Sequence, residues 1–113
     1  MGIYEALKTY FGYDNFKKGQ EKLINAIFAG RDVLGIMPTG GGKSLCYQLP
    51  ATVLEGVTIV ISPLISLMKD QVDSLDEMGL AGTFINSTLD YNEFITRLDE
   101  IRNNKYKLIY VEI

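Results

Sequence analysis

The sequence predicts an α/β fold: a parallel sheet flanked by helices, and incomplete at its carboxyl end. Segments with helical periodicity alternate along the 113 residues with short runs of β-branched and other apolar residues. Strands separated by helices of roughly ten to fifteen residues are typical of βαβ crossovers, which place successive strands parallel to one another. The length leaves room for one small domain.

The first half of the chain is predicted to hold a helix, a strand and a second helix. Apolar residues within 23–28 share one helical face, and Gly30 stands where a helix is expected to end. Residues 32–37 read as a buried strand. Residues 43–54 are predicted to form the second helix, which Pro50 should end or kink.

The second half begins with residues 57–61, an unbroken β-branched run typical of a strand covered on both faces. Ser62 is predicted to cap the next helix, with Pro63 at its first position. Apolar residues then recur at helical spacing until Gly79, where this helix is expected to stop.

Two further strands and one helix complete the predicted order. Residues 83–85 form a short third strand, and Asp90 with Glu93 three positions later predicts a capping box. The helix it opens is amphipathic through Ile101. Residues 106–111 then form a fourth strand.

Composition excludes several kinds of site. There is no histidine, and Cys46 is the single cysteine, so zinc sites, disulfides within the chain, Ser-His-Asp triads and Cys-His dyads are ruled out. No apolar run reaches the ~18 residues that span a bilayer. The simplest compartment is a reducing cytosol, near the nucleoid in a bacterium. A net charge of -3 argues against tight nucleic-acid binding by this chain alone.

A glycine-rich segment between the predicted strand and helix is the strongest chemical signal. Three consecutive glycines let backbone N–H groups turn around a phosphate, and the following helix N-terminus favours negative charge. Lys43 can reach the β- and γ-phosphates of a nucleotide, and the Ser44 hydroxyl suits Mg²⁺. The alternative is a glycine-rich turn with a solvated lysine. The predicted nucleotide-binding residues here are Met37, Thr39, Gly40, Gly41, Gly42, Lys43 and Ser44.

Five segments together resemble the RecQ family of ATP-dependent DNA helicases, in the order found in that family. They are FGYDNFKKGQ (11–20), MPTGGGKSLCYQLP (37–50), SPLISLMKDQ (62–71), NST (86–88) and LIYV (108–111). The resemblance covers nearly the whole chain. It implies the N-terminal part of a RecA-like P-loop NTPase lobe, with adenine-recognition helices in 1–30 and the phosphate loop and βα units in 31–113.

The resemblance implies a role for three residues in binding ATP. Gln20 occupies the position that reads adenine, because its carboxamide can match the donor and acceptor of that base. Tyr13 stands where the family stacks a ring on adenine, and Lys17 where most members have arginine. The alternatives are that Tyr13 and Phe16 pack between two helices, and that Gln20 is an ordinary exposed residue.

The resemblance also implies contacts with the backbone of single-stranded DNA. Ser62 and Pro63 would form a phosphate-binding corner at a helix N-terminus, and Asn86 with Ser87 would form a second one after a strand. The alternative is that both sites only cap helices. An acidic cluster, Asp70, Asp73, Asp76 and Glu77, is interpreted as a solvated helix face in which Lys69 pairs with Asp73.

The implied function is an ATP-dependent 3′-to-5′ DNA helicase that uses Mg²⁺ and whose ATPase activity is stimulated by DNA. Its acidic magnesium motif and its second lobe are not in these 113 residues, so this chain alone is expected to be inactive. We also expect an unpaired sheet edge and self-association. The alternatives are a standalone ATP-binding module without motor activity and a small-molecule P-loop kinase.

Overall fold

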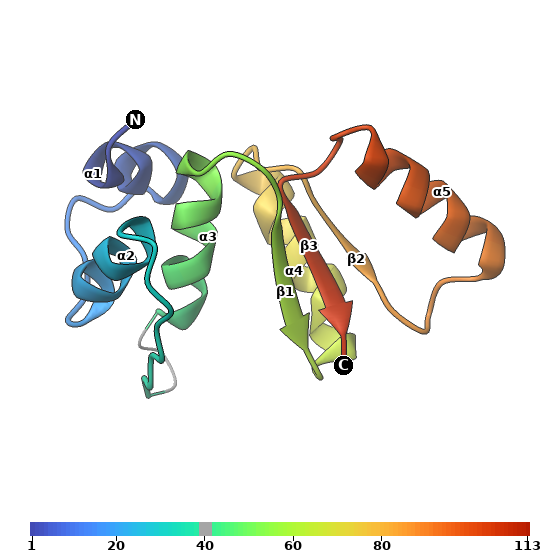
Figure 1. The fold of residues 1–113 in the computed structure, drawn as a ribbon, viewed down its shortest axis with the longest axis horizontal. Coiled ribbons are helices and arrows are strands. Elements are labelled where there is room, and N and C mark those ends of the chain that lie inside the picture. The colour runs from blue at the N-terminus through green and yellow to red at the C-terminus, as the bar shows by residue number, and fades with distance from the viewer. Residues whose placement is uncertain (39–41) are drawn as a thin grey trace. The chain divides into compact units, whose positions relative to one another are not determined.

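The computed structural model describes residues 1–38 and 42–113. The chain divides into two compact units, residues 1–55 and residues 56–113. The first unit is helical in its described part, and the second holds a parallel sheet with helices (Figure 1). The α/β class and the parallel strands that the sequence predicts are thereby confirmed.

Three helical segments build the first unit. Helix α1 (Ile3–Ala6) continues into a π-helical turn, η1 (Leu7–Phe11), and the chain then turns at Gly12 with φ +75°. Helix α2 spans Gln20–Phe28, and Gly30 follows it with φ +80°, as the sequence predicts. The segments pack on one buried cluster, Ala6, Leu7, Ile24, Leu45 and Leu49.

Helix α3 spans Lys43–Val53 and continues past Pro50, so the expectation that the helix would end at this proline is wrong. Proline costs a helix one N–H donor and crowds the preceding turn. Here it lies in the last turn, where its carbonyl still accepts a hydrogen bond from Leu54 N at 2.9 Å. Pro50 is also buried, so its ring packs within the first unit.

The strand predicted at residues 32–37 does not form, so the predicted phosphate-loop strand is wrong. These residues carry no regular secondary structure, and Leu34 and Ile36 are each 88% exposed. A strand exists only through ladder hydrogen bonds with a neighbour. In the described part of the first unit the other elements are helices, whose backbone groups are already paired.

Three strands, not the predicted four, form the sheet of the second unit. They are β1 (Thr58–Ser62), β2 (Gly82–Ile85) and β3 (Leu108–Glu112), in the spatial order β1-β3-β2. Both pairings are parallel, with Thr58 opposite Leu108 and Gly82 opposite the same residue. Strand β3 is therefore central, and its first three residues are buried.

Strand β1 lies at the edge of this sheet, and its predicted coverage on both faces is wrong. Ile59 is 62% exposed and Ile61 68% exposed. A β-branched run indicates strand formation, but the burial of each face depends on what packs there. Helix α4 (Ile65–Glu77) packs mainly on β2, where Leu75 lies over Gly82.

Helix α4 begins two residues later than predicted. Its N-cap is Leu64, so Ser62 is not the cap and Pro63 is not the first helical residue. The Ser62 hydroxyl instead accepts a hydrogen bond from Leu64 N at 3.1 Å. This local bond satisfies an amide ahead of the helix. The end of the helix is as predicted, with Gly79 at φ +80°.

Helix α5 (Tyr91–Arg102) begins with the predicted capping box. Glu93 N donates to Asp90 Oδ1 at 2.7 Å, and Asp90 N donates to Glu93 Oε1 at 3.1 Å. These two bonds satisfy amides that the helix leaves unpaired. The helix has no fully buried residue, and several polar contacts link it to the rest of the second unit.

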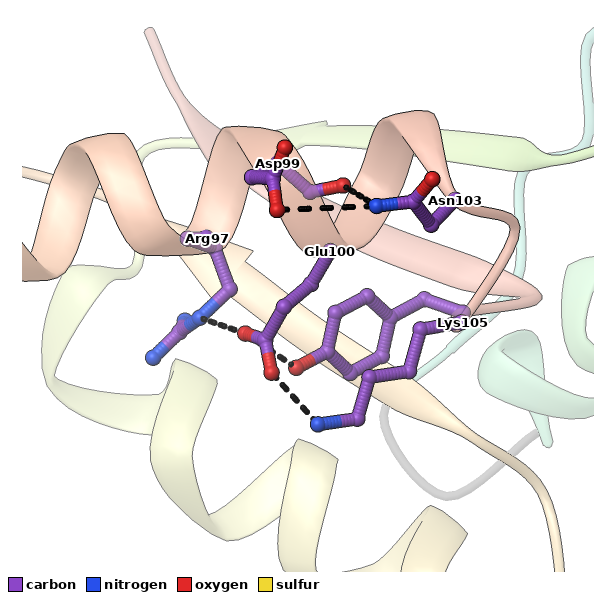
Figure 2. Close-up of polar contacts among 6 residues, drawn as sticks. Arg97, Asp99, Glu100, Asn103 and Lys105 are labelled. Atoms are coloured by element: carbon purple, nitrogen blue, oxygen red, sulfur yellow. Dashed lines mark hydrogen bonds and ion pairs between the residues drawn. The ribbon is translucent and has the colours of Figure 1, made fainter.

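Figure 2 shows the Glu100 carboxylate between Arg97 and Lys105, with each of which it forms an ion pair. Arg97 Nη1 donates to the Phe84 carbonyl at 2.6 Å, and its guanidinium lies 5.3 Å from the centre of the Phe84 ring. Tyr106 donates to Glu100 Oε1 at 3.0 Å, and Lys105 forms an ion pair with the same carboxylate. The hydrogen bonds from Lys105 and Tyr106 lower the pKa of Glu100. The cluster thus joins α5 to the end of β2 and to the loop before β3.

Within the described ranges, 1–38 and 42–113, none of the helices has both the length and the apolar character needed to cross a membrane.

Candidate nucleotide and nucleic-acid sites

A cavity of about 290 Å³ in the first unit brings together several of the predicted nucleotide-binding residues. It lies among the loop after η1, the start of α2 and the start of α3. The lining residues are Phe11, Tyr13, Asn15, Lys17, Gln20, Gly42, Ser44, Leu45 and Gln48. The predicted adenine-recognition residues and the end of the phosphate loop therefore share one space.

Gln20 links the two sides of this cavity. Its side chain is 3% exposed, and its Oε1 accepts a hydrogen bond from Lys17 N at 2.7 Å. Its Nε2 donates to the Gly42 carbonyl at 3.1 Å, across 22 positions of sequence. The prediction of an ordinary exposed residue is excluded by this burial. A carboxamide has a second N–H and a second lone pair, so Gln20 can keep both bonds and still address a ligand.

Tyr13 and Phe16 lie in different surroundings. Tyr13 is 57% exposed and lines the cavity, so its ring face is available to a planar ligand. Phe16 packs against the buried cluster and meets Tyr4 edge-on, with ring centres 5.1 Å apart. The packing alternative therefore describes Phe16 but not Tyr13.

The two phosphate-loop side chains at the start of α3 line different spaces. Ser44 lines the cavity that contains Gln20. Lys43 is exposed and, with Met37, lines a separate space of about 240 Å³ beside the extended residues 33–37. Gly42 precedes the helix with φ +79°, a conformation that favours glycine. Thr39, Gly40 and Gly41 lie outside the described residues.

Sequence reasoning missed Gln48, which is 7% exposed and lines the cavity from α3. Its spacing of four residues from Ser44 places both on one helical face, and that spacing was the available signal. Cys46 lies on the opposite side of α3, and burial raises the pKa of its thiol. Buried thiols of raised pKa are poor nucleophiles, which fits a packing role.

In the second unit the predicted nucleic-acid contacts lie at the carboxyl ends of parallel strands. Ser62 ends β1 and pairs in register with Glu112, while Ile85 at the end of β2 pairs with Val111. The carboxyl end of the sheet therefore brings together Ser62, Pro63, Asn86 and Ser87. Loops at this end are the usual place for ligands in parallel α/β sheets.

Asn86 and Ser87 differ in accessibility. Asn86 is 8% exposed, and its Oδ1 accepts hydrogen bonds from Thr88 N at 2.9 Å and from Thr88 Oγ1 at 2.5 Å. Its Nδ2 donates to Met68 Sδ at 3.4 Å. Ser87 and Thr88 are exposed, but both Thr88 donors are used in the bonds to Asn86. The accessible donor side chain of this loop is thus that of Ser87.

The acidic residues of α4 lie on its exposed face, as predicted. Lys69 Nζ is 3.0 Å from Asp73 Oδ2, and this hydrogen bond raises the pKa of the lysine. Across residues 1–38 and 42–113, no cluster of three or more histidine, cysteine or acidic side chains is arranged to hold a metal ion.

Comparisons with known proteins place the chain among helicases. The family model described as DEAD/DEAH box helicase matches residues 17–112. The ATP-dependent DNA helicase RecQ of Bacillus subtilis is 53% identical over 106 residues, which are 93% of this chain and 18% of that protein. The protein of the same name from Haemophilus influenzae is 50% identical over 105 residues, 93% of this chain and 17% of the relative. The chain therefore spans less than a fifth of the length of these curated relatives.

Proposed function

Because the chain belongs to the DEAD/DEAH box helicase family, we propose that it forms the N-terminal part of the first motor lobe of an ATP-dependent DNA helicase. The curated relatives named RecQ and the ordered motifs support this proposal. The whole protein would couple ATP hydrolysis to 3′-to-5′ movement along DNA. This chain would supply nucleotide binding and part of the contact with single-stranded DNA.

One observation carries the nucleotide assignment: the Gln20 carboxamide and the Ser44 hydroxyl line the same cavity, with the Tyr13 ring at its side. In the proposed complex Gln20 reads the purine edge and Tyr13 stacks on the base, with Lys17 adding positive charge beside it. Lys43 at the start of α3 holds the β- and γ-phosphates.

The remaining phosphate-loop residues would complete this nucleotide site. We assign backbone contacts with the phosphates to Thr39, Gly40, Gly41 and Gly42, after Met37. The donor set fits magnesium, because the Ser44 hydroxyl is an oxygen ligand at the cavity and Mg²⁺ prefers oxygen. Bound magnesium would neutralise charge on the phosphates during transfer.

The DNA contact is assigned to the carboxyl edge of the sheet. Ser62 and Pro63 before α4 and Ser87 after β2 lie at this edge, where hydroxyls and backbone amides can meet phosphates. The unpaired edge of β1 supports the further proposal that the isolated chain self-associates, since Ile59 and Ile61 are exposed there. Sedimentation velocity at several concentrations tests this.

Calorimetric titration with Mg-ATP and Mg-GTP tests the nucleotide assignment. We expect the unmodified chain to prefer ATP, and Gln20→Ala to lose that preference, because only the carboxamide distinguishes the two purine edges. Lys43→Ala should weaken the binding of both nucleotides. Matched controls are Asn25→Ala and Lys22→Ala, exposed positions of α2 outside this cavity, which should bind like the unmodified chain.

Equal affinity of the unmodified chain for the two nucleotides would refute the adenine assignment. If Gln20→Ala still prefers ATP, the role of Gln20 in selecting the base is refuted, while nucleotide binding at this cavity still stands. Thermal unfolding of each variant, followed by circular dichroism, separates a binding loss from a loss of the folded first unit.

A further inference from the structure

The Asn86 side chain is engaged within the protein, although the family motif would have it touch DNA. Both hydrogen bonds accepted by its Oδ1 come from Thr88, one from the backbone amide and one from the hydroxyl. An amide oxygen has two lone pairs, so these bonds use its accepting capacity. Asn86 is 8% exposed, and unlike that of Gln20 its acceptor oxygen has no lone pair left for a ligand.

The other end of the carboxamide reaches a different element. Asn86 Nδ2 donates to the thioether of Met68, which lies on α4 and is fully buried. Helix α4 begins just after Ser62 and Pro63, the other predicted DNA contact. Through Asn86, the loop after β2 is therefore fastened to the helix that follows the loop after β1.

The loop that Asn86 shapes is fixed at both ends. Leu89 N donates to the Asn86 carbonyl at 3.2 Å, and the capping box at Asp90 follows immediately. Between these fixed points Ser87 and Thr88 are exposed, and because both Thr88 donors are bonded to Asn86, the groups offered to a ligand are those of Ser87. Hydroxyls and backbone N–H groups of this kind commonly bind nucleic-acid phosphates.

We propose that Asn86 is a positioning residue: bonded to Met68 and Thr88, it holds the loop so that the exposed Ser87 meets the phosphates of a single strand at the carboxyl end of the sheet. This inference rests on the proposed function and refines it. Asn86 itself does not touch the nucleic acid, and the buried Met68 takes part in binding without access to the ligand.

Met68 makes the proposal testable, because a residue with no exposed surface cannot contact DNA. Met68→Leu keeps the apolar volume and removes the sulfur acceptor. The matched control is Met78→Leu, at the C-cap of the same helix and away from the Asn86 side chain. The probe is a fluorescently labelled oligothymidine, titrated with the 113-residue chain and followed by anisotropy.

We expect Asn86→Ala to weaken oligonucleotide binding roughly three- to tenfold and Met68→Leu about two- to threefold, as the loss of ordinary and weak hydrogen bonds implies. The double variant should bind no worse than Asn86→Ala, because both changes act through one contact. Met78→Leu should bind like the unmodified chain. The amide NMR signals of β1, β2 and β3 should stay dispersed in all variants, which a loss of structure in the second unit would not allow.

Two results overturn the proposal in different ways. A loss of binding in Asn86→Ala with none in Met68→Leu would make Asn86 a direct contact and leave the proposed function standing. If the unmodified chain does not bind the oligonucleotide, the proposed DNA contact fails and the inference fails with it. If Asn86→Ala does not fold, comparing the oligonucleotide affinities of Met68→Leu and Met78→Leu still tests the proposal. Hydrogen exchange of the Thr88 amide should then be faster in Met68→Leu than in Met78→Leu, and equal rates would count against the proposal.

Discussion

Replacing Gly42 with alanine tests whether the Gln20 carboxamide is held against the start of α3. Gly42 has φ +79°, and an added Cβ would lie 2.2 Å from Gln20 Nε2. Gly30 offers a matched control in the same unit, because it has φ +80° and no atom within 4 Å of an added Cβ. The two variants share the backbone cost and differ only in the displaced side chain.

The expected magnitudes follow from these contacts. A left-handed conformation costs a residue with a Cβ about 1–2 kcal/mol in either variant. Gly42→Ala must also move Gln20, whose end is flexible but holds hydrogen bonds to the Gly42 carbonyl and to Lys17 N. Each bond contributes about 1 kcal/mol net. We therefore expect Gly42→Ala to lower the free energy of unfolding about 1–2 kcal/mol more than Gly30→Ala.

The assay is urea unfolding followed through the amide NMR signals of α2 and α3, which reports on the first unit directly. A parallel titration with Mg-ATP should show weaker binding in Gly42→Ala than in Gly30→Ala, since Gly42→Ala displaces the proposed adenine contact and alters a residue of the proposed phosphate loop. Equal destabilisation of the two variants would refute the reasoning, because it would mean that the Gln20 bonds contribute nothing.

Two further predictions concern α5. Asp90→Ala removes the acceptor for Glu93 N and should lower the stability of this helix by about 1 kcal/mol, measured by urea unfolding of its amide signals; an unchanged midpoint would contradict the capping role. The pKa of Glu100 is lowered in the folded chain, so its ionised carboxylate stabilises the fold. This contribution to the free energy of unfolding is fully present above the ordinary glutamate pKa of about 4.3 and is lost as the pH falls through the lower pKa of the folded chain. NMR titration of its carboxyl carbon should give a midpoint below that ordinary value, and Lys105→Met should move the midpoint upward.

The elements that sequence predicted well depend on local chemistry. The capping box at Asp90 and the ends of α2 and α4 at Gly30 and Gly79 involve residues within one turn of each other. The family resemblance could be seen in the sequence because it rests on the order of motifs. The matched family model and the RecQ relatives confirm it. None of these depends on how distant elements pack.

The failures are those in which a distant partner decides. The apolar run at 32–37 satisfies the pattern of a strand but has no neighbouring strand to pair with among residues 1–38 and 42–55. The run that forms β1 does pair, yet pattern alone does not reveal that it lies at an edge with Ile59 and Ile61 exposed. Pro50 is tolerated because it is buried in a last turn, which its identity alone does not indicate.

The candidate sites divide in the same way. That Gln20 and Gly42 meet across 22 positions was expected only through the family resemblance. Gln48 was missed, although its spacing from Ser44 placed it on the same helical face. The motif at Asn86 gives residue types alone, so it does not reveal the hydrogen bond to Met68, which lies 18 positions earlier on another element.

The central place of β3 has a consequence for the order in which the second unit can fold during synthesis. Strands β1 and β2 leave the ribosome first, yet each pairs with β3, and the paired residues Thr58 and Leu108 are about fifty positions apart. Such high contact order slows folding, because a long loop must close before any ladder forms. Until then two apolar strands remain open to neighbouring nascent chains, a condition that favours aggregation and invites chaperone binding.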